Sequence, residues 1–290
     1  MISLIICSRA SGISTDLKQN IQYTIGVDYE LIIIDNSKNR YSIFEAYNEG
    51  VKRSMYPYLC FMHEDILFHT IDWGKKVIEH FENKDVGLIG VVGGHFLPDV
   101  ATWAFTAVDS GIIIQGDRNL LKNDNYSGQK LIHDKYRKEG ESRIQVVAVD
   151  GLWLCFPKLI FNEISFDNQT YTGFHGYDLD ISMQVNVAGY NVYAIFNIII
   201  EHFSWGGFDS NYALSIDNFH KKWCDYLPLV KGVVMTETEK SFRAELAMSN
   251  FENRLQIDRL KMELRQIRAS KAYNIGKLIL KPIAWLIRIF

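Results

Sequence analysis

Three clusters of polar residues follow three short apolar runs near the start of the chain. The clusters are Ser8-Arg9 after residues 2–7, Asp35-Asn36-Ser37 after residues 30–34, and His63-Glu64-Asp65 after residues 58–62. Short apolar runs of this kind are typical of strands that are buried on both faces of a parallel sheet. Because the carboxyl ends of parallel strands meet at one edge, we expect the three clusters to face one cleft.

The residue types in these clusters suit the binding of a nucleotide diphosphate and a cation. An acid after the second strand, Asp35, is well placed to accept hydrogen bonds from a ribose or a base. The imidazole of His63 and the carboxylate of Asp65 suit a divalent cation that bridges two phosphates. Each also has a structural interpretation, Asp35 as a turn or cap residue and residues 63–65 as a charged strand-to-helix connection.

Alternating strand-like and helix-like segments must position these clusters. Helical patterns cover residues 14–25, 42–54, 73–83 and 178–188, the last closed by Gly189, and further strand patterns cover 86–92, 144–149 and 192–200. This alternation predicts an α/β fold with right-handed crossovers. Residues 93–145 are less regular and predict loops with a small antiparallel insertion.

The order and spacing of the motifs resemble the family 2 group of GT-A glycosyltransferases over about residues 1–205. An initial strand is followed by Asp35, by Ala-Tyr-Asn-Glu-Gly at 46–50 and by Phe-Met-His-Glu-Asp at 61–65. The resemblance implies a GT-A, Rossmann-like, mostly parallel sheet flanked by helices. It also implies that six residues surround the nucleotide of the donor: Ser8, Arg9, Asp35, Asn36, Asn48 and Glu64.

The same resemblance implies a divalent metal, Mn²⁺ or Mg²⁺. Asp65 takes the second acidic place of the family's D-x-D motif, but His63 occupies the first, as in a variant branch with His-x-Asp. Histidine can bind Mn²⁺ yet lowers the negative charge of the site. A late histidine completes the metal shell in many such enzymes, which implies His202. A lone histidine at a strand end is also often a structural hydrogen-bonding residue.

The segment Phe-His-Gly-Tyr-Asp-Leu-Asp at 174–180 resembles the family's acidic segment at the head of a helix. The resemblance implies that Asp178 is the catalytic base of an inverting enzyme, with Asp180 as the alternative. Inversion is a single displacement that needs one carboxylate to take the acceptor's proton and a metal to neutralise the departing diphosphate. Asp178 and Asp180 are equally suited to stabilise the start of a helix.

The acceptor pocket is implied by position in the same family. Asp150, Gly151 and Trp153 follow a strand, and Tyr177 replaces the usual glutamate before the base. Trp153 could stack on the apolar face of a sugar, and a buried core tryptophan is an equal alternative.

Bulk properties exclude several other classes of protein. The net charge of −3 over 290 residues argues against a nucleic-acid partner. No P-loop motif and no G-x-G-x-x-G after the first strand occur, which argues against a P-loop NTPase and a dinucleotide oxidoreductase. The four cysteines form no C-x-x-C pair and predict reduced, buried thiols in a cytoplasmic protein. We expect neither a signal peptide nor a transmembrane span.

The chain divides into a GT-A domain at 1–235, a charged helix at 236–270 and a basic amphipathic tail at 271–290. Leu246, Ile257, Leu260, Leu264 and Ile267 partly match heptad spacing, so residues 236–270 fit a helix packed on its own domain or a short coiled coil in a homodimer. The tail fits an element on the inner leaflet of the membrane or a helix docked on protein.

Together these features predict transfer of a sugar from a nucleotide-sugar donor, with a UDP-sugar favoured, to a saccharide or lipid-linked saccharide. The enzyme would be cytoplasmic, with an option of peripheral attachment to the cytoplasmic face of the membrane. The alternatives are a catalytically inactive GT-A-fold scaffold and a nucleotidyltransferase. Residues 8–12, Ser-Arg-Ala-Ser-Gly, form only a poor phosphate loop for the latter.

Overall fold

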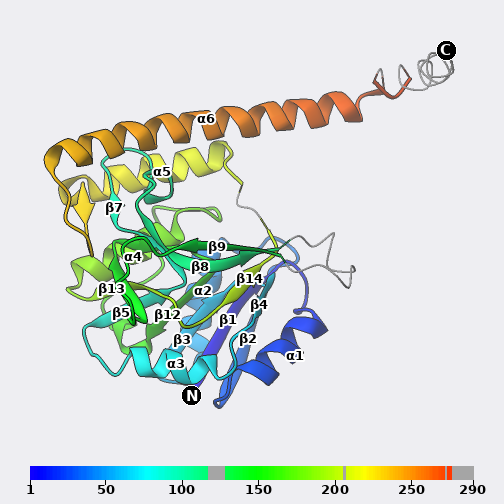
Figure 1. Ribbon diagram of the computed structural model, residues 1–290. Coiled ribbons are helices and arrows are strands. Elements are labelled where there is room, and N and C mark those ends of the chain that lie inside the picture. Colours follow the sequence, from blue (N-terminus) through cyan, green and yellow to red (C-terminus); the bar gives the residue numbers. More distant parts are fainter. Residues whose placement is uncertain (117–127, 205–206, 272, 276–290) are drawn as a thin grey trace, which may run out of the picture.

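A seven-stranded sheet forms the centre of the computed structural model, which describes residues 1–116, 128–204, 207–271 and 273–275 (Figure 1). In spatial order its strands are β10 (Arg143–Val146), β13 (Asn191–Ile195), β5 (Val86–Gly90), β12 (Trp153–Pro157), β3 (Tyr58–Met62), β1 (Ile2–Ser8) and β2 (Tyr29–Asp35). The pairings of β1 with β2 and β3, and of β13 with β5, are parallel, whereas β12 runs antiparallel to both β3 and β5. The predicted mostly parallel sheet is therefore confirmed, with β10 and β12 reversed.

Helices cover both faces of this sheet. They are α1 (Thr15–Thr24), α2 (Ile43–Arg53), α3 (Trp73–His80) and α4 (Tyr177–Val187). Alternate residues of β1 serve two separate cores, because side chains along a strand alternate between faces. Ile5 packs in the core with α2 and α4, and Leu4 packs in the core with α1 and α3. The predicted flanking helices are thus present.

A capping box starts α2. The hydroxyl of Ser42 accepts a hydrogen bond from the backbone N–H of Glu45, whose carboxylate accepts one from the backbone N–H of Ser42. This reciprocal pair satisfies two of the donors that a helix start leaves free.

A second sheet lies at the carboxyl edge of the first. Its strands, in order, are β11 (Ala148–Val149), β6 (Val92–Gly94), β8 (Asp109–Gln115), β14 (Ile200–His202) and β4 (Ile66–Phe68), and β9 (Gln129–His133) pairs with β8. The sequence predicted only a small antiparallel insertion at 93–145. The strands β4, β6, β11 and β14 have only two or three residues, too few for a clear pattern, and the longer β8 pairs with the distant β14. Antiparallel pairing of β14 with β4 sets His202 opposite Ile66 and therefore next to Asp65.

Among the described residues, the remaining elements are two short strands, two helices and three short 3-10 helices. They are β7 (Phe96–Leu97), β15 (Leu229–Val230), α5 (Ser210–Trp223), α6 (Glu237–Ala269) and the short 3-10 helices η1 (Trp103–Phe105), η2 (Lys158–Asn162) and η3 (Cys224–Tyr226). Figure 1 shows α6 running alongside α5 and extending past it. The predicted C-terminal helix is thus present. Most of the predicted tail, residues 276–290, lies outside the described residues. Within the described part of the chain, no helix is long and apolar enough to cross a membrane.

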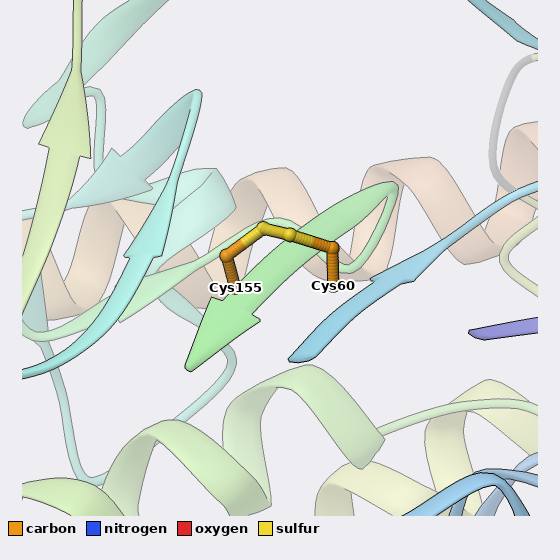
Figure 2. Close-up of a disulfide and its surroundings, with 2 residues drawn as sticks. All are labelled: Cys60 and Cys155. Atoms are coloured by element: carbon orange, nitrogen blue, oxygen red, sulfur yellow. A yellow bond between two sulfur atoms is a disulfide. The ribbon is translucent and has the colours of Figure 1, made fainter. Parts of the chain in front are cut away.

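Two cysteines form a disulfide, which corrects the prediction that all four are reduced (Figure 2). Cys60 in β3 and Cys155 in β12 are fully buried and directly opposite in the antiparallel register, with Cα atoms 4.2 Å apart. Their separation of 95 residues hides this pairing from sequence patterns. Cys7 and Cys224 are free thiols, as predicted, although Cys224 is exposed.

Candidate active site

Two histidines and one aspartate meet where the two sheets join. His63 and Asp65 lie in the connection from β3 to β4, and His202 ends β14. One ligand atom from each of these three residues lies within 4.8 Å of the others. The Nδ1 atom of His63 and the Nε2 atom of His202 lie 3.8 Å and 3.7 Å from one carboxylate oxygen of Asp65. Imidazole nitrogens and a carboxylate suit Mn²⁺ and similar transition metals, so the residues fit the predicted cation.

Tyr177 fixes the orientation of the His63 ring. The hydroxyl of Tyr177 donates to the carbonyl of Gly151 at 2.9 Å, and its oxygen lies 2.9 Å from Nε2 of His63. Because the tyrosine proton is used on the carbonyl, Nε2 of His63 carries the proton and donates it to the tyrosine oxygen. The lone pair of Nδ1 then faces Asp65 and His202, as metal coordination requires. Sequence reasoning assigned Tyr177 to the acceptor pocket and missed this contact.

The electrostatic surroundings also keep His63 neutral. Burial lowers the pKa of His63, and the neighbouring His202 lowers it further, against an opposing effect of Asp65. A neutral imidazole is the form that binds a metal. The ring is therefore poised as a ligand and not as a cation.

Replacement of Tyr177 by phenylalanine should weaken metal binding. Loss of an outer hydrogen-bond partner of a histidine ligand reduces metal affinity by roughly 10- to 100-fold in other sites. We expect a loss of this size in a Mn²⁺ titration followed by electron paramagnetic resonance. Tyr171→Phe is the matched control. It also removes one hydroxyl from a buried tyrosine, but that hydroxyl donates to Asp180 and does not contact His63. Equal Mn²⁺ affinities of Tyr177→Phe and the wild type would contradict the assignment.

Asp178 lies in the first turn of α4, directly after Tyr177. Gly176 begins this helix with φ of 82°, a left-handed conformation that suits glycine. Desolvation by burial and the nearby charge of Asp150 raise the pKa of Asp178 to about 7, partly offset by backbone hydrogen bonds that include Leu179 and Gly151. A half-buried carboxylate with a pKa near neutrality is suited to accept a proton as a general base.

The loop between β11 and β12 brings two of the predicted acceptor residues to the site. Asp150 accepts a hydrogen bond from the backbone N–H of Leu152 at 2.9 Å, and its charge acts on both His63 and Asp178. At Gly151 a Cβ atom would lie 2.2 Å from the hydroxyl oxygen of Tyr177, so glycine is required for this approach.

Trp153 does not belong to the acceptor pocket. Its side chain has no exposed surface and packs in the core near Phe68 and Trp73, with ring centroids 6.4 Å and 6.2 Å away. As an inward-facing residue of β12 it cannot reach a sugar. The core alternative considered for this residue is therefore the one the structure supports.

Some of the predicted nucleotide-binding residues are exposed to solvent, and others are hydrogen-bonded within the protein. Arg9 and Asp35 are exposed at the carboxyl ends of β1 and β2. The side-chain hydroxyl of Ser37 and its backbone N–H, the latter at 2.9 Å, both hydrogen-bond to Asp35 and lower the pKa of its carboxyl. Glu64 accepts from the hydroxyl of Ser8 at 2.6 Å and from the backbone N–H of Arg9 at 3.4 Å. The carboxylate of Glu64 thus ties the end of β1 to the end of β3.

A cavity of about 290 Å³ opens beside Asp35. Lys38, Arg40 and Arg53 contribute cationic side chains to its lining. The cavity is therefore suited to the anionic or polar part of a ligand held at the end of β2.

Two asparagines assigned to the nucleotide serve the fold instead. The side chain of Asn36 bonds both the backbone N–H and the carbonyl of Tyr41, at 3.0 Å and 2.8 Å. The side chain of Asn48 in α2 likewise bonds the carbonyl and the N–H of Phe166, at 2.7 Å and 3.1 Å. Because the amide groups of both residues are engaged with backbone, we remove them from the candidate site.

Asp180, the alternative base, points away from the cluster. Asp180 is fully buried. Its carboxylate accepts hydrogen bonds from the side chains of Trp223 at 2.9 Å and Gln184 at 2.7 Å. It also forms an ion pair with Lys222 at 2.7 Å. Both carboxylate oxygens are thus engaged in linking α4 to the end of α5. The geometry assigns Asp180 a structural role, which leaves Asp178 as the candidate base.

Removal of this buried carboxylate should destabilise the fold. Deleting Asp180 leaves the buried indole N–H of Trp223 without its acceptor, which costs about 1–3 kcal/mol, whereas Lys222 keeps a second ion pair with Asp167 at 2.7 Å. We expect Asp180→Ala to lower the free energy of unfolding by about this amount in denaturant titrations. Asp217→Ala removes an exposed partner of Lys221 on α5 and should cost no more than about 1 kcal/mol. Equal stabilities of the two variants would contradict the assignment.

Ser204 is a further polar residue at the cluster that sequence reasoning missed. Its hydroxyl lies 3.2 Å from Nε2 of His202. Side chains two residues apart along an extended chain point to the same side. The position of Ser204 two residues after His202 could therefore have predicted that it lies at the cluster.

The mostly parallel sheet with helices on both faces is the architecture expected of a GT-A transferase. A family model described as "Glycosyltransferase like family" matches residues 3–242. The chain therefore belongs to this family of glycosyltransferases.

Two similar proteins agree with this membership. The streptomycin biosynthesis protein StrF of Streptomyces griseus is 26% identical over 159 residues, which are 53% of this chain and 50% of that protein. The chain thus spans about half of the length of this relative. The mannosyltransferase PcManGT of Pyrobaculum calidifontis, solved in complex with GDP-Man and Mn²⁺, has a TM-score of 0.51 at 10% identity. This likeness covers 96% of this chain and 83% of that one and supports the fold.

Proposed function

We propose that this glycosyltransferase moves a sugar from a nucleotide-sugar donor to an acceptor hydroxyl, with inversion and with the help of a divalent cation. The observation that carries the proposal is the dipeptide Tyr177-Asp178. Tyr177 contacts His63 of the cation cluster, and the next residue is a carboxylate with a pKa of about 7. The dipeptide thus links the cation cluster directly to the candidate base.

In this reaction the acceptor hydroxyl gives its proton to Asp178 as its oxygen attacks the anomeric carbon. The bond from that carbon to the phosphate oxygen breaks, and the nucleoside diphosphate leaves with the bonding electrons. His63, Asp65 and His202 would hold the cation, which supplies positive charge for the departing diphosphate. The nearby charge of Asp150 raises the proton affinity of Asp178.

The donor would be bound by exposed residues at the ends of β1 and β2. Arg9 offers a cation for phosphate, and Asp35 accepts hydrogen bonds from ribose or base. The GDP-Man complex of PcManGT supports a nucleotide-sugar donor in general. A UDP-sugar is the first donor to test here, and a GDP-sugar is the second.

The acceptor would be a saccharide, free or lipid-linked, held near Asp150 and Gly151. A lipid-linked acceptor fits attachment of the chain to the cytoplasmic face of the membrane through the basic tail. Deletion of residues 271–290 should then abolish binding to anionic vesicles. Unchanged binding would exclude the tail as the anchor.

A product analysis separates the proposal from its two alternatives. Purified protein with Mn²⁺ is incubated with acceptor candidates and common nucleotide sugars, and in a separate reaction with a nucleoside triphosphate and a sugar phosphate. Release of nucleoside diphosphate supports a glycosyltransferase, and release of pyrophosphate from a nucleoside triphosphate and a sugar phosphate supports a nucleotidyltransferase. A scaffold protein would release neither and would bind UDP or GDP without metal dependence.

The rate of transfer should rise with pH until Asp178 is ionised. Because the base must be unprotonated and its pKa is about 7, log(kcat/KM) should increase below pH 7 and level off above it. The pKa of His63 is lowered, so its protonation affects the metal only at more acidic pH. Initial rates between about pH 5.5 and 9 measure this. A profile that is flat across pH 7 would contradict the role of Asp178.

A further inference from the structure

The second half of α6 exposes a regular row of large apolar side chains. Ile257, Leu260, Leu264 and Ile267, here called the α6 seam, are 47%, 54%, 46% and 57% exposed. Every residue from 259 to 269 is exposed, and Figure 1 shows this half of the helix extending past α5. Apolar rows of this kind on a soluble surface mark an interaction site.

A different face of α6 packs on the protein's own domain. Ala247 and Phe251 are buried, and the Phe251 ring lies 5.5 Å from that of Phe105 in η1. Further along, Asp258 accepts from the backbone N–H of Phe208 at 3.3 Å. Beyond residue 258 the helix is clear of the domain over its described length, so the α6 seam is open to another molecule.

The spacing of the α6 seam fits a second helix. Its residues follow one another at intervals of three, four and three, which assigns Ile257 and Leu264 to a positions and Leu260 and Ile267 to d positions of a heptad. A repeat of 3.5 residues keeps such a row in contact with a partner helix that supercoils around it. Charged residues closely flank the row on both sides, which fits a narrow helix contact better than burial in a lipid surface.

The charges beside the seam select the orientation of a self-pairing. The e positions Arg254, Lys261 and Arg268 are all basic, and the g position Glu263 is acidic. In a parallel pair g faces e, so Glu263 of one copy meets Arg268 of the other. In an antiparallel pair the e positions of the two helices face each other, so basic residues would meet basic residues and repel. We propose that the α6 seam pairs with the same seam of a second copy of this chain as a short parallel coiled coil.

This inference does not depend on the proposed transferase activity. Two heptads give a small interface, so the dimer should form reversibly with protein concentration. Glu263 also pairs with Arg259 of its own helix at 3.1 Å, but both side chains are largely exposed. Such a surface pair is weak and leaves Glu263 free to change partner.

Sedimentation equilibrium of the full chain tests the pairing. We expect the wild type to move from monomer to dimer as concentration rises. Leu264→Lys should raise the dissociation constant more than about tenfold, because it places a charge in the seam. Gln266→Lys adds the same charge two residues away, outside the seam, and should leave dimerisation unchanged. A wild type that stays monomeric over the whole concentration range would overturn the proposal.

A charge reversal tests the orientation. Glu263→Lys should weaken the dimer roughly two- to tenfold, and the added change Arg268→Glu should restore it. If Arg268→Glu alone strengthens the dimer, the helices are antiparallel and the proposed pairing is overturned. Flotation with anionic vesicles tests whether the α6 seam binds a membrane surface and not a second copy of the chain. A monomeric chain whose vesicle binding is lost in Leu264→Lys would assign the seam to a membrane surface instead.

Discussion

Asp178→Asn should abolish sugar transfer while leaving metal and donor binding intact. The substitution keeps the size of the side chain but removes the group that accepts the acceptor's proton. General-base catalysis contributes about 10²- to 10⁴-fold to a rate, so kcat should fall by at least the lower figure. Metal and donor affinity should change little, because His63, Asp65 and His202 are untouched. Steady-state kinetics and donor titration of the same preparation measure both.

The same variant has a stability signature. An acid whose pKa is raised on folding stabilises the folded state at low pH and loses that contribution as pH rises through its folded pKa. For Asp178 this loss is complete above pH 7, since its pKa is raised from 3.8 to about 7. Asparagine cannot ionise, so the Asp178→Asn protein should unfold at a higher temperature than the wild type at pH 8. An inactive variant that is also less stable at pH 8 would indicate misfolding and not loss of a base.

A matched control is available in α1. Asp16 also lies in the first turn of a helix, but it is exposed and is not a member of the cluster. Asp16→Asn should therefore retain full activity and the wild-type unfolding temperature. If Asp178→Asn keeps a rate within about threefold of the wild type, Asp178 is not the base.

Asp65→Ala should remove the metal site. The carboxylate of Asp65 is the only anionic ligand in the described cluster, and both histidines approach the same oxygen within 3.8 Å. Without it, two neutral imidazoles hold a divalent cation poorly, and we expect Mn²⁺ affinity to fall more than about 100-fold. Turnover should fall with it, because the leaving diphosphate then lacks its counter-charge.

The neighbouring carboxylate provides the control for Asp65. Glu64 is engaged with Ser8 and the backbone of Arg9 and is not a member of the cluster. Glu64→Gln should therefore keep the Mn²⁺ affinity of the wild type in the absence of nucleotide. Similar losses of Mn²⁺ affinity in Glu64→Gln and Asp65→Ala would show that general negative charge, and not coordination, holds the metal.

Local patterns allowed much of the first sheet to be predicted. The strands β1, β2 and β3 are short apolar runs, and α1 and α2 each begin at a serine cap and bury one face, so their bounds follow from nearby residues. The position of His63 and Asp65 at the carboxyl edge followed from the strand ends, whereas the approach of His202 to them was implied by the family resemblance.

Long-range pairing accounts for what the sequence did not predict. The second sheet depends on β8 meeting β14, and the disulfide depends on Cys60 meeting Cys155 across 95 residues. Residue type alone also does not reveal the partner of a polar side chain. Asn48 fits a nucleotide site as well as it fits the backbone of Phe166, and only the folded chain decides between the two.

Calorimetric titration of a nucleoside diphosphate into the protein, with Mn²⁺ and with a chelator, tests the mixed histidine and aspartate metal site most directly. UDP and GDP should each be tried. If His63, Asp65 and His202 hold a cation for the diphosphate, at least one nucleotide should bind with Mn²⁺ and lose most of its affinity with the chelator. Asp65→Ala should then bind equally weakly under both conditions. Nucleotide binding that is the same with Mn²⁺ and with chelator in the wild type would contradict a metal-dependent glycosyltransferase.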